Sequence, residues 1–275
     1  MAEVLALMSS LLYGASDFTS GLMSRRTSAY AITGIAAAVS GVLFLINALN
    51  NGNVAFDQTS VTSGIFTGIF LLGGNLTFLW AIKGAPMGVV GGICTLSTLV
   101  PVAFASAHGE ALSSASMVGV VVVIVGVIML GVPDMRGRSS LGSLGLALIS
   151  AVLFGLRSVS VNNGSQDSSF AVLFIAEVVG VVILGSGALV TRSWGGVGRR
   201  DLLPIACIGV LNALAFAAYS VATREGNLAV VSVLAGLAPI ALAVLAWLIA
   251  KEKLAKVQVL ALVVVVVGSM LVAVG

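Results

Sequence analysis

Long apolar runs separated by short polar breaks extend along the whole chain. A helix needs about 20 apolar residues to cross a bilayer, because its backbone polar groups must be satisfied within the segment. The breaks contain glycine, proline, asparagine or charged residues, which are typical of turns. The pattern predicts ten transmembrane helices, over residues 4–23, 30–48, 61–82, 87–107, 114–132, 141–161, 169–190, 202–222, 228–249 and 256–274.

One ten-residue stretch occurs twice in this pattern. Residues 5–14 read LALMSSLLYG and residues 146–155 read LALISAVLFG, with six identical positions and an offset of 141 residues. The same offset aligns Lys83 with Arg224. An offset of about half the chain length indicates an internal duplication. We therefore predict two five-helix repeats joined by a short linker, with boundaries at 1–132, 133–140 and 141–275.

The number of helices in each predicted repeat determines how the two copies are oriented. Because five is odd, the second copy should enter the membrane from the opposite side to the first. Inverted repeats of this kind recur in secondary transporters, where two similar halves give two related states. The alternative is that duplication only enlarged a helical bundle. The predicted fold class is an all-α integral membrane protein of ten helices in two inverted repeats.

Composition supports a membrane protein and excludes a soluble domain. The chain is 59% hydrophobic and 8% charged, with a mean hydropathy of +1.17, whereas soluble domains carry about 25% charged residues. The basic residues occur one to three at a time between apolar runs, so we expect no nucleic-acid partner. Because Glu3 precedes the first apolar run and no positive segment does, we expect a first transmembrane helix and not a signal peptide. We expect the protein in the plasma membrane, of the bacterial inner-membrane type.

The basic residues also predict an orientation. Eleven of the 13 lie in the connections after the first, third, fifth, seventh and ninth predicted helices, and the exceptions are Arg157 and Arg224. The positive-inside rule places these connections in the cytoplasm and both termini outside.

Three ionisable residues lie inside predicted helices: Asp17, Arg157 and Glu177. A charge at the bilayer centre costs about 3 kcal/mol on insertion scales, so such residues usually face a cavity or a partner. Arg157 and Glu177 could form a structural ion pair, or they could bind substrate or protons. Asp17 could extend toward the nearby basic loop or face a cavity. Since Arg157 and Asp17 align with Ser16 and Ser158 of the other repeat, the charges are asymmetric additions, and together they could hold a zwitterion.

Polar and aromatic side chains in the same helices are further candidates for substrate binding. An intramembrane asparagine often bonds to a neighbouring helix, and tryptophan is common near helix ends, so each has a competing structural explanation. Pro101 and Pro239 are expected to bend the fourth and ninth helices. The further candidates are Tyr13, Ser16, Asn75, Trp80, Asn212 and Tyr219.

No pattern of an enzyme or a metal site is present in the sequence. The single histidine, His108, cannot build a multi-histidine site, and no phosphate-binding loop occurs. Cys94 and Cys207 both lie in apolar runs and imply no disulfide framework. We therefore expect neither enzymatic activity nor a cofactor nor a metal.

The layout resembles the EamA-type ten-helix members of the drug/metabolite transporter superfamily over the whole chain. The matching features are the aromatic-glycine pairs Tyr13-Gly14 and Phe154-Gly155, and the ends of the two repeats, Pro101 to Glu110 and Pro239 to Glu252. The resemblance implies a secondary carrier, often an exporter, with a central cavity between the halves. It also implies cytoplasmic termini, contrary to the charge pattern.

These observations predict a secondary transporter that exports small metabolites, such as amino acids or amphipathic compounds, by alternating access. Its expected partners are a small-molecule substrate, protons as a candidate coupling ion, and the lipid bilayer, with the protein a monomer or homodimer. Two alternatives stay open. One is a sugar or nucleotide-sugar carrier of the same fold, and the other is a membrane scaffold subunit that transports nothing.

Overall fold

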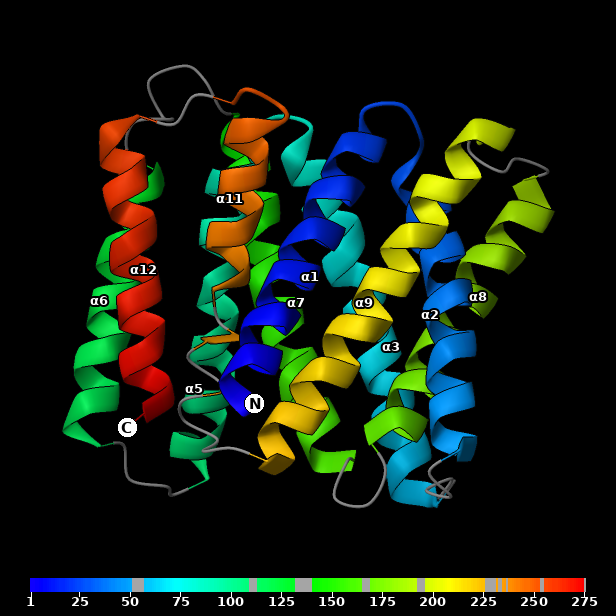
Figure 1. Ribbon diagram of the computed structural model, residues 1–275, viewed down its shortest axis with the longest axis horizontal. Coiled ribbons are helices and arrows are strands. Elements are labelled where there is room, and N and C mark those ends of the chain that lie inside the picture. The colour runs from blue at the N-terminus through cyan, green and yellow to red at the C-terminus, as the bar shows by residue number, and fades with distance from the viewer. Residues whose placement is uncertain are drawn as a thin grey trace.

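The computed structural model describes residues 1–50, 57–108, 113–131, 140–164, 169–191, 196–225, 231, 234–235, 237–252 and 255–274, and these residues are helical almost throughout (Figure 1). The helices of the first repeat are α1 (Ala2–Ser24), α2 (Ala29–Asn50), α3 (Gln58–Ile82), α4 (Met87–Cys94), the 3₁₀ turn η1 (Thr95–Thr98), α5 (Leu99–Ala107) and α6 (Ser114–Gly131). Those of the second are α7 (Leu141–Gly164), α8 (Ser169–Thr191), α9 (Arg199–Glu225), α11 (Ala238–Leu248) and α12 (Lys256–Val274).

The sequence predicted most of these helices closely. For eight of the ten predicted spans, the first and last residues lie within three residues of the first and last residues of one observed helix. In the described ranges, six segments are long and apolar enough to cross a bilayer, and three shorter helices are also apolar. The chain is therefore a multi-pass membrane protein. The six segments are Ala29–Asn50, Gln58–Ile82, Met87–Phe104, Leu141–Asn163, Phe170–Val190 and Arg199–Thr223.

The two remaining spans, the fourth and the ninth, differ from the prediction near their prolines. The fourth span is interrupted by η1, ahead of Pro101, which is the third residue of α5. Pro239 lies in the first turn of α11. Proline has no backbone N–H to donate. In the first turn of a helix this costs no hydrogen bond, because the N–H groups there have no acceptor within the helix. Pro239 therefore begins α11, whereas Pro101 follows directly after the 3₁₀ turn within the apolar segment Met87–Phe104. Residues 228–230, 232–233 and 236 of the ninth predicted span lie outside the described residues.

Polar residues at the breaks start the helices by accepting hydrogen bonds from the free N–H groups of the first turn. The Asp57 carboxylate accepts from the Ser60 N–H at 3.3 Å, and the hydrogen bonds from Ser60 hold the pKa of Asp57 below its ordinary value. Ser28, Ser113 and Ser140 cap α2, α6 and α7 in the same way, toward Ala31, Ser116 and Ser143.

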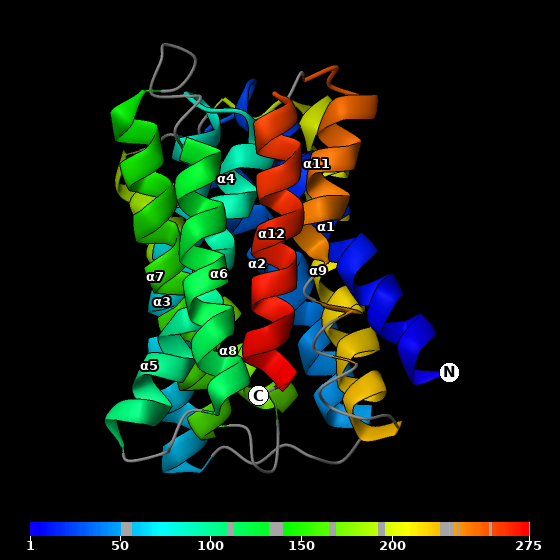
Figure 2. The ribbon, with the colours of Figure 1, turned by 90° about the vertical axis from the view of Figure 1, so that its left-hand side faces the viewer.

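Contacts among helix ends define one end of the bundle, which we call the basic end. There the Arg25 guanidinium, after α1, lies 2.7 Å from a carboxylate oxygen of Glu252, after α11. The other carboxylate oxygen accepts from the Met87 N–H at the start of α4. Ser140, at the start of α7, donates its N–H to the carbonyl oxygen of Gly84, just after α3. Thus α7 begins where α1 ends, and both termini lie at the opposite end (Figures 1 and 2).

The packing of the helices relates the two repeats by an approximate twofold symmetry. Helices α1, α2, α3 and α6 correspond to α7, α8, α9 and α12, and α11 corresponds to part of the interrupted segment that α4, η1 and α5 form. Three contacts between the repeats pair with three others: α3 on α7 with α9 on α1, α3 on α8 with α9 on α2, and η1 and α5 on α7 with α11 on α1. Three join counterparts directly: α2 on α8, α4 on α11, and α6 on α12. The last pair forms one side of the bundle in Figure 1.

Glycines at equivalent positions allow the closest of these contacts. A Cβ added at Gly68 of α3 would lie 2.6 Å from the Ala176 carbonyl oxygen of α8. A Cβ added at Gly209 of α9, which is 141 residues further on, would lie 2.5 Å from the Ala36 carbonyl oxygen of α2. Small residues permit such backbone contact between membrane helices, where packing and not water exclusion drives association.

Candidate functional site

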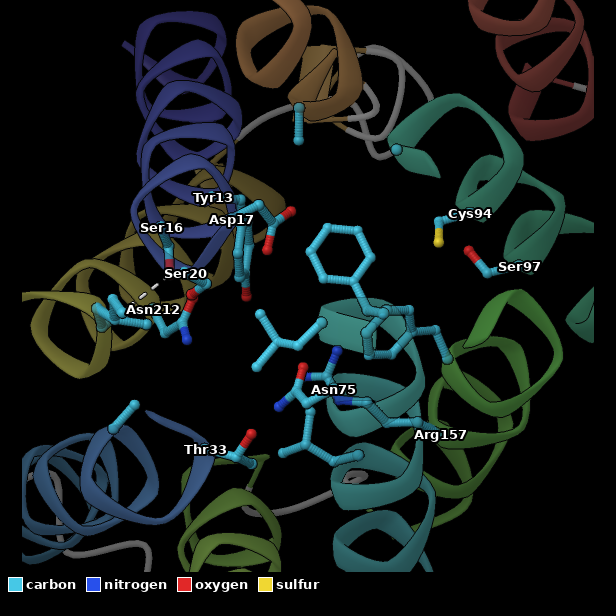
Figure 3. Close-up of a pocket in the computed structure, with 18 of the residues that line it drawn as sticks. Tyr13, Ser16, Asp17, Ser20, Thr33, Asn75, Cys94, Ser97, Arg157 and Asn212 are labelled. Atoms are coloured by element: carbon cyan, nitrogen blue, oxygen red, sulfur yellow. Dashed lines mark hydrogen bonds between the residues drawn. The ribbon is translucent and has the colours of Figure 1, made fainter. Parts of the chain in front are cut away.

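A cavity of about 330 Å³ lies between the two repeats near the middle of the helices. Helices α1, α2, α3, α4, α7, α8, α9 and α11 all contribute to its wall, together with η1. Figure 3 shows its polar lining, including Ser20 and Thr33, which the sequence did not single out. A volume of this size is at the lower end for pockets that enclose small organic molecules.

The repeated motif places two structural glycines beside this cavity. A Cβ added at Gly14 of α1 would lie 2.9 Å from the Ala238 carbonyl oxygen of α11. A Cβ added at Gly155 of α7 would lie 2.8 Å from the Ser97 carbonyl oxygen of η1, and Ser97 aligns with Ala238 at the offset of 141. The two glycines therefore let α11 approach α1 and η1 approach α7. The preceding aromatics, Tyr13 and Phe154, both line the cavity.

Helix α1 presents four polar side chains to the cavity at positions 13, 16, 17 and 20, a spacing that keeps them on one helical face. Ser16 donates to the Ile208 carbonyl oxygen at 3.4 Å. Asp17 points into the cavity in Figure 3, and it makes no hydrogen bond or ion pair to another described residue. The predicted alternative, in which Asp17 extends to the basic loop, does not occur. Its carboxylate is available to a ligand.

Arg157 lines the wall that α7 forms, and in Figure 3 its guanidinium points toward Asn75 of α3. Its Nε is buried without a hydrogen-bond partner among the described residues. The guanidinium is close enough to influence both the Tyr13 hydroxyl and the Glu177 carboxyl electrostatically. The ion pair considered between Arg157 and Glu177 is not formed, since no salt bridge within 4.0 Å joins them. Arg157 is therefore a cation on the wall with donor capacity left over.

Glu177 is the most buried carboxyl group of the cavity, with 8% of the residue exposed. It lies on α8, and its Oε1 is 2.8 Å from the hydroxyl of Ser40 on α2. Asn212 of α9 also lines the cavity, as the sequence predicted. The cavity thus brings together Asp17 of α1, Arg157 of α7 and Glu177 of α8.

Two candidates lie away from the cavity, contrary to expectation. Trp80 packs near the basic end of α3, where its ring makes an edge contact with Tyr30 at 5.8 Å. Tyr219 packs against a cluster that includes Ala6 and Ala222. Tyr219 lies about two turns beyond the lining residue Asn212 along α9, and Trp80 directly follows the lining residue Leu79 without lining the cavity itself.

Several hydroxyl groups of the wall were missed because nothing in a single helix separates them from ordinary packing residues. Thr33 of α2 is 7% exposed, and its hydroxyl has no hydrogen-bond partner in the described part of the protein. Thr95, Ser97 and Thr98 reach the cavity because η1 interrupts the fourth span. The signals for η1 in the sequence were Pro101, which follows it, and the residues TLST, three of them polar, within an apolar segment.

The cavity is closed toward the basic end. Between it and that end lie buried apolar side chains, among them Ile82, Met87 and Leu242, each at most 4% exposed. On the opposite side, the lining residues Thr98 and Ser158 are exposed. Among the described residues, the cavity is therefore covered toward the basic end and more exposed toward the end that carries both termini.

The fold and the cavity define a class of protein: a multi-pass membrane protein of two similar helical halves around a polar cavity. The family model of the EamA-like transporter family matches residues 1–132 and 141–274. The chain belongs to this family, whose members are transporters and not enzymes.

Solved structures share the fold. Twenty-two chains match significantly. One of them, titled "Crystal structure of protein", has a TM-score of 0.71 over 98% of this chain and 95% of that chain, at 17% sequence identity. At this identity the likeness shows the fold alone. A comparison with curated proteins gave no significant match.

Proposed function

We propose that the protein is a secondary transporter that carries a small zwitterionic or amphipathic metabolite, such as an amino acid, through the cavity. The observation that supports this most is the free carboxylate of Asp17 on α1 together with the incompletely paired guanidinium of Arg157 on α7. A carboxylate binds an ammonium group, and a guanidinium binds a carboxylate with two parallel hydrogen bonds. Apolar walls, including Phe78 and Phe154, suit the uncharged part of such a solute.

The proposed mechanism is alternating access between two inverted repeats. We propose that the chain crosses the bilayer ten times, with α7 to α12 oriented oppositely to α1 to α6. The support is that α7 begins at the end where α1 finishes, and that the packing has an approximate twofold symmetry. The observed cavity is more exposed toward the termini, and the symmetry provides a related state open toward the basic end.

The same proposal assigns the sides of the membrane. The basic end faces the cytoplasm of a bacterial-type plasma membrane, and both termini face outward, because Arg25, Lys83, Arg199 and Lys251 all lie at the basic end. Export is the direction implied by the resemblance to exporters. A reporter fused to the C-terminus, probed with a protease on intact cells, tests the orientation. Digestion of the reporter is expected, and protection would reverse the assignment.

Transport itself is tested with the purified protein in proteoliposomes. The probes are labelled L-threonine and L-phenylalanine as zwitterions, choline as a cation, succinate as an anion and glucose as a neutral solute. We expect the zwitterions to enter at a rate above that of protein-free liposomes. The Asp17→Asn and Arg157→Gln variants should lose this uptake by 10-fold or more, about the effect of losing one charge-assisted contact of 1.4 kcal/mol.

The other outcomes separate the alternatives. Preferential movement of glucose would favour a sugar carrier of the same fold. Movement of none of the five probes, from protein that is folded and correctly inserted, would favour a scaffold subunit and contradict the proposed class of substrate.

A further inference from the structure

Glu177 and Ser40 form a hydrogen bond between the two repeats that involves a buried carboxyl group. The Glu177 carboxyl, on α8, is almost fully buried, and the Ser40 hydroxyl oxygen, on α2, is 2.8 Å from its Oε1. Gly41 makes the approach possible, since a Cβ there would lie 3.1 Å from the Cβ of Glu177. The pair lies on the cavity wall, so it can be reached from the cavity.

The Ser40 hydroxyl has a second acceptor within reach. The carbonyl oxygen of Ala36, one turn earlier on α2, is 2.9 Å away. A hydroxyl has one hydrogen to donate and can accept others, so it can donate to Glu177 or to Ala36 but not to both at once.

Two complete hydrogen-bond arrangements follow, which differ by one proton. When Glu177 is ionised, Ser40 donates its hydrogen to the carboxylate. When Glu177 carries a proton, the carboxyl donates that proton to the Ser40 oxygen, and Ser40 turns its own hydrogen to the Ala36 carbonyl. Neither arrangement leaves the hydrogen of Ser40 or of Glu177 unpaired, so the hydrogen bond between the two side chains exists in both protonation states.

The other charged and titratable groups of the cavity are arranged differently. Arg157 from α7 is the basic group that influences Glu177, and Tyr13 and Asp17 from α1 are the remaining titratable side chains beside it on the wall, apart from Cys94 of α4. Asp17 has no hydroxyl partner comparable to Ser40 among the described residues. It therefore offers its oxygens to a ligand and not to an internal donor.

We propose that Glu177 and Ser40 form a proton-binding site separate from the solute site of Asp17 and Arg157. This inference rests on the proposed transport function and names its coupling ion and the residues that bind it. Binding of the proton changes the charge beside Arg157 by one. Because coupling between two sites is reciprocal, the proton and the anionic group of the solute then alter each other's affinity.

A first experiment detects the proton without any solute. Infrared difference spectra of the purified, reconstituted protein between alkaline and acidic buffer are expected to contain the C=O band of a buried protonated carboxyl group. Glu177→Gln removes this band, while Ser40→Ala keeps it but shifts its frequency and its midpoint pH, because the hydroxyl partner is lost. Two controls should leave the band unchanged: Glu3→Gln, an exposed carboxyl at the N-terminus, and Ser186→Ala, whose hydroxyl bonds only to the backbone of its own helix.

The result that overturns the proposal is equally specific. If the band persists in Glu177→Gln, or if Ser40→Ala leaves both its frequency and its midpoint unaltered, the pair is not a proton site. Ser40→Ala decides this even if Glu177→Gln fails to fold.

A second experiment measures coupling, with labelled L-phenylalanine as the probe. In proteoliposomes, the wild type and Glu3→Gln should accumulate the probe above equilibrium when an imposed proton gradient drives it. Glu177→Gln should lose accumulation yet still exchange internal for external probe. Accumulation that survives in Glu177→Gln would overturn the proton site, whereas a wild type that moves no probe would count against the proposed function and leave the infrared result standing.

Discussion

The hydroxyl of Ser9 on α1 donates a hydrogen bond of 2.8 Å to the carbonyl oxygen of Ala215 on α9. An equivalent bond exists in the other half, where Ser150 of α7 donates to the Gly74 carbonyl oxygen of α3 at 2.9 Å. The two acceptor residues, Gly74 and Ala215, are 141 residues apart in the sequence, as the two serines are. The repeated motif therefore forms the same contact twice, each time between the two repeats.

This equivalence predicts equal effects on stability. Ser9→Ala and Ser150→Ala should each lower the free energy of unfolding by about 0.6 kcal/mol, the average for hydrogen bonds between membrane helices. The double variant should lose about twice as much, because the bonds are distant from each other. Denaturant titration in mixed micelles, with Ser186→Ala as the control, measures these differences. A loss in one variant only would contradict the equivalence.

The glycine contacts between repeats predict a much larger effect. Gly68→Val and Gly209→Val place a side chain against the backbone of the facing helix, and each should destabilise the protein by on the order of 3 kcal/mol. Gly185→Val is the matched control, because nothing lies within 4 Å of a Cβ added there. The yield of monodisperse protein and its melting temperature report the difference. Tolerance of valine at position 68 or 209 would show that the packing there is looser than described.

The unpaired hydroxyl of Thr33 predicts that one substitution changes stability and transport in opposite directions. Thr33→Val removes a buried donor that has no described partner, so the protein should become more stable, by about 1 kcal/mol, while the KM for the transported solute rises. Thr67 of α3 is the control, because its hydroxyl is also buried and unpaired but does not line the cavity. Thr67→Val should gain stability with an unchanged KM. Equal KM values in the two variants would remove Thr33 from the solute site.

The contacts of Glu252 predict how the basic end is held closed. Glu252→Gln weakens the contacts to Arg25 and to the Met87 N–H, so the state open to that end should become more populated. In a Cys207→Ser background, Cys94 on the cavity wall reports this opening through a membrane-impermeant maleimide added on the basic side. We expect labelling to be faster by about two- to fivefold, the range set by a partly exposed ion pair. Arg25→Gln should have the smaller effect, because Glu252 then keeps its bond to Met87.

Much of the fold could be predicted because a bilayer imposes long apolar helices, and the repeat at Leu5 and Leu146 fixed how they group. The charged candidates were also accessible, since Asp17, Arg157 and Glu177 are costly in lipid unless they face a cavity. The sequence of a single helix does not show which other helices pack against it. The sequence could not show that Glu177 would meet Ser40 and not Arg157, nor that η1 would interrupt the fourth span, because both depend on which helices pack together. The motif residues Ser9 and Gly14 make contacts between the repeats that recur in the other half. The positions just beyond the motif line the cavity, and there the repeats differ: Ser16 and Asp17 in the first correspond to Arg157 and Ser158 in the second.

We propose that the cavity opens alternately to the two ends of the bundle. The most direct measurement is the labelling of Cys94 in the Cys207→Ser protein, with an impermeant maleimide applied to one side of the membrane at a time. We expect labelling from both sides, with L-phenylalanine slowing it and with faster labelling from the side of the termini, toward which the cavity is more exposed. Labelling from one side only under all conditions, or from neither side in correctly inserted protein, would contradict it.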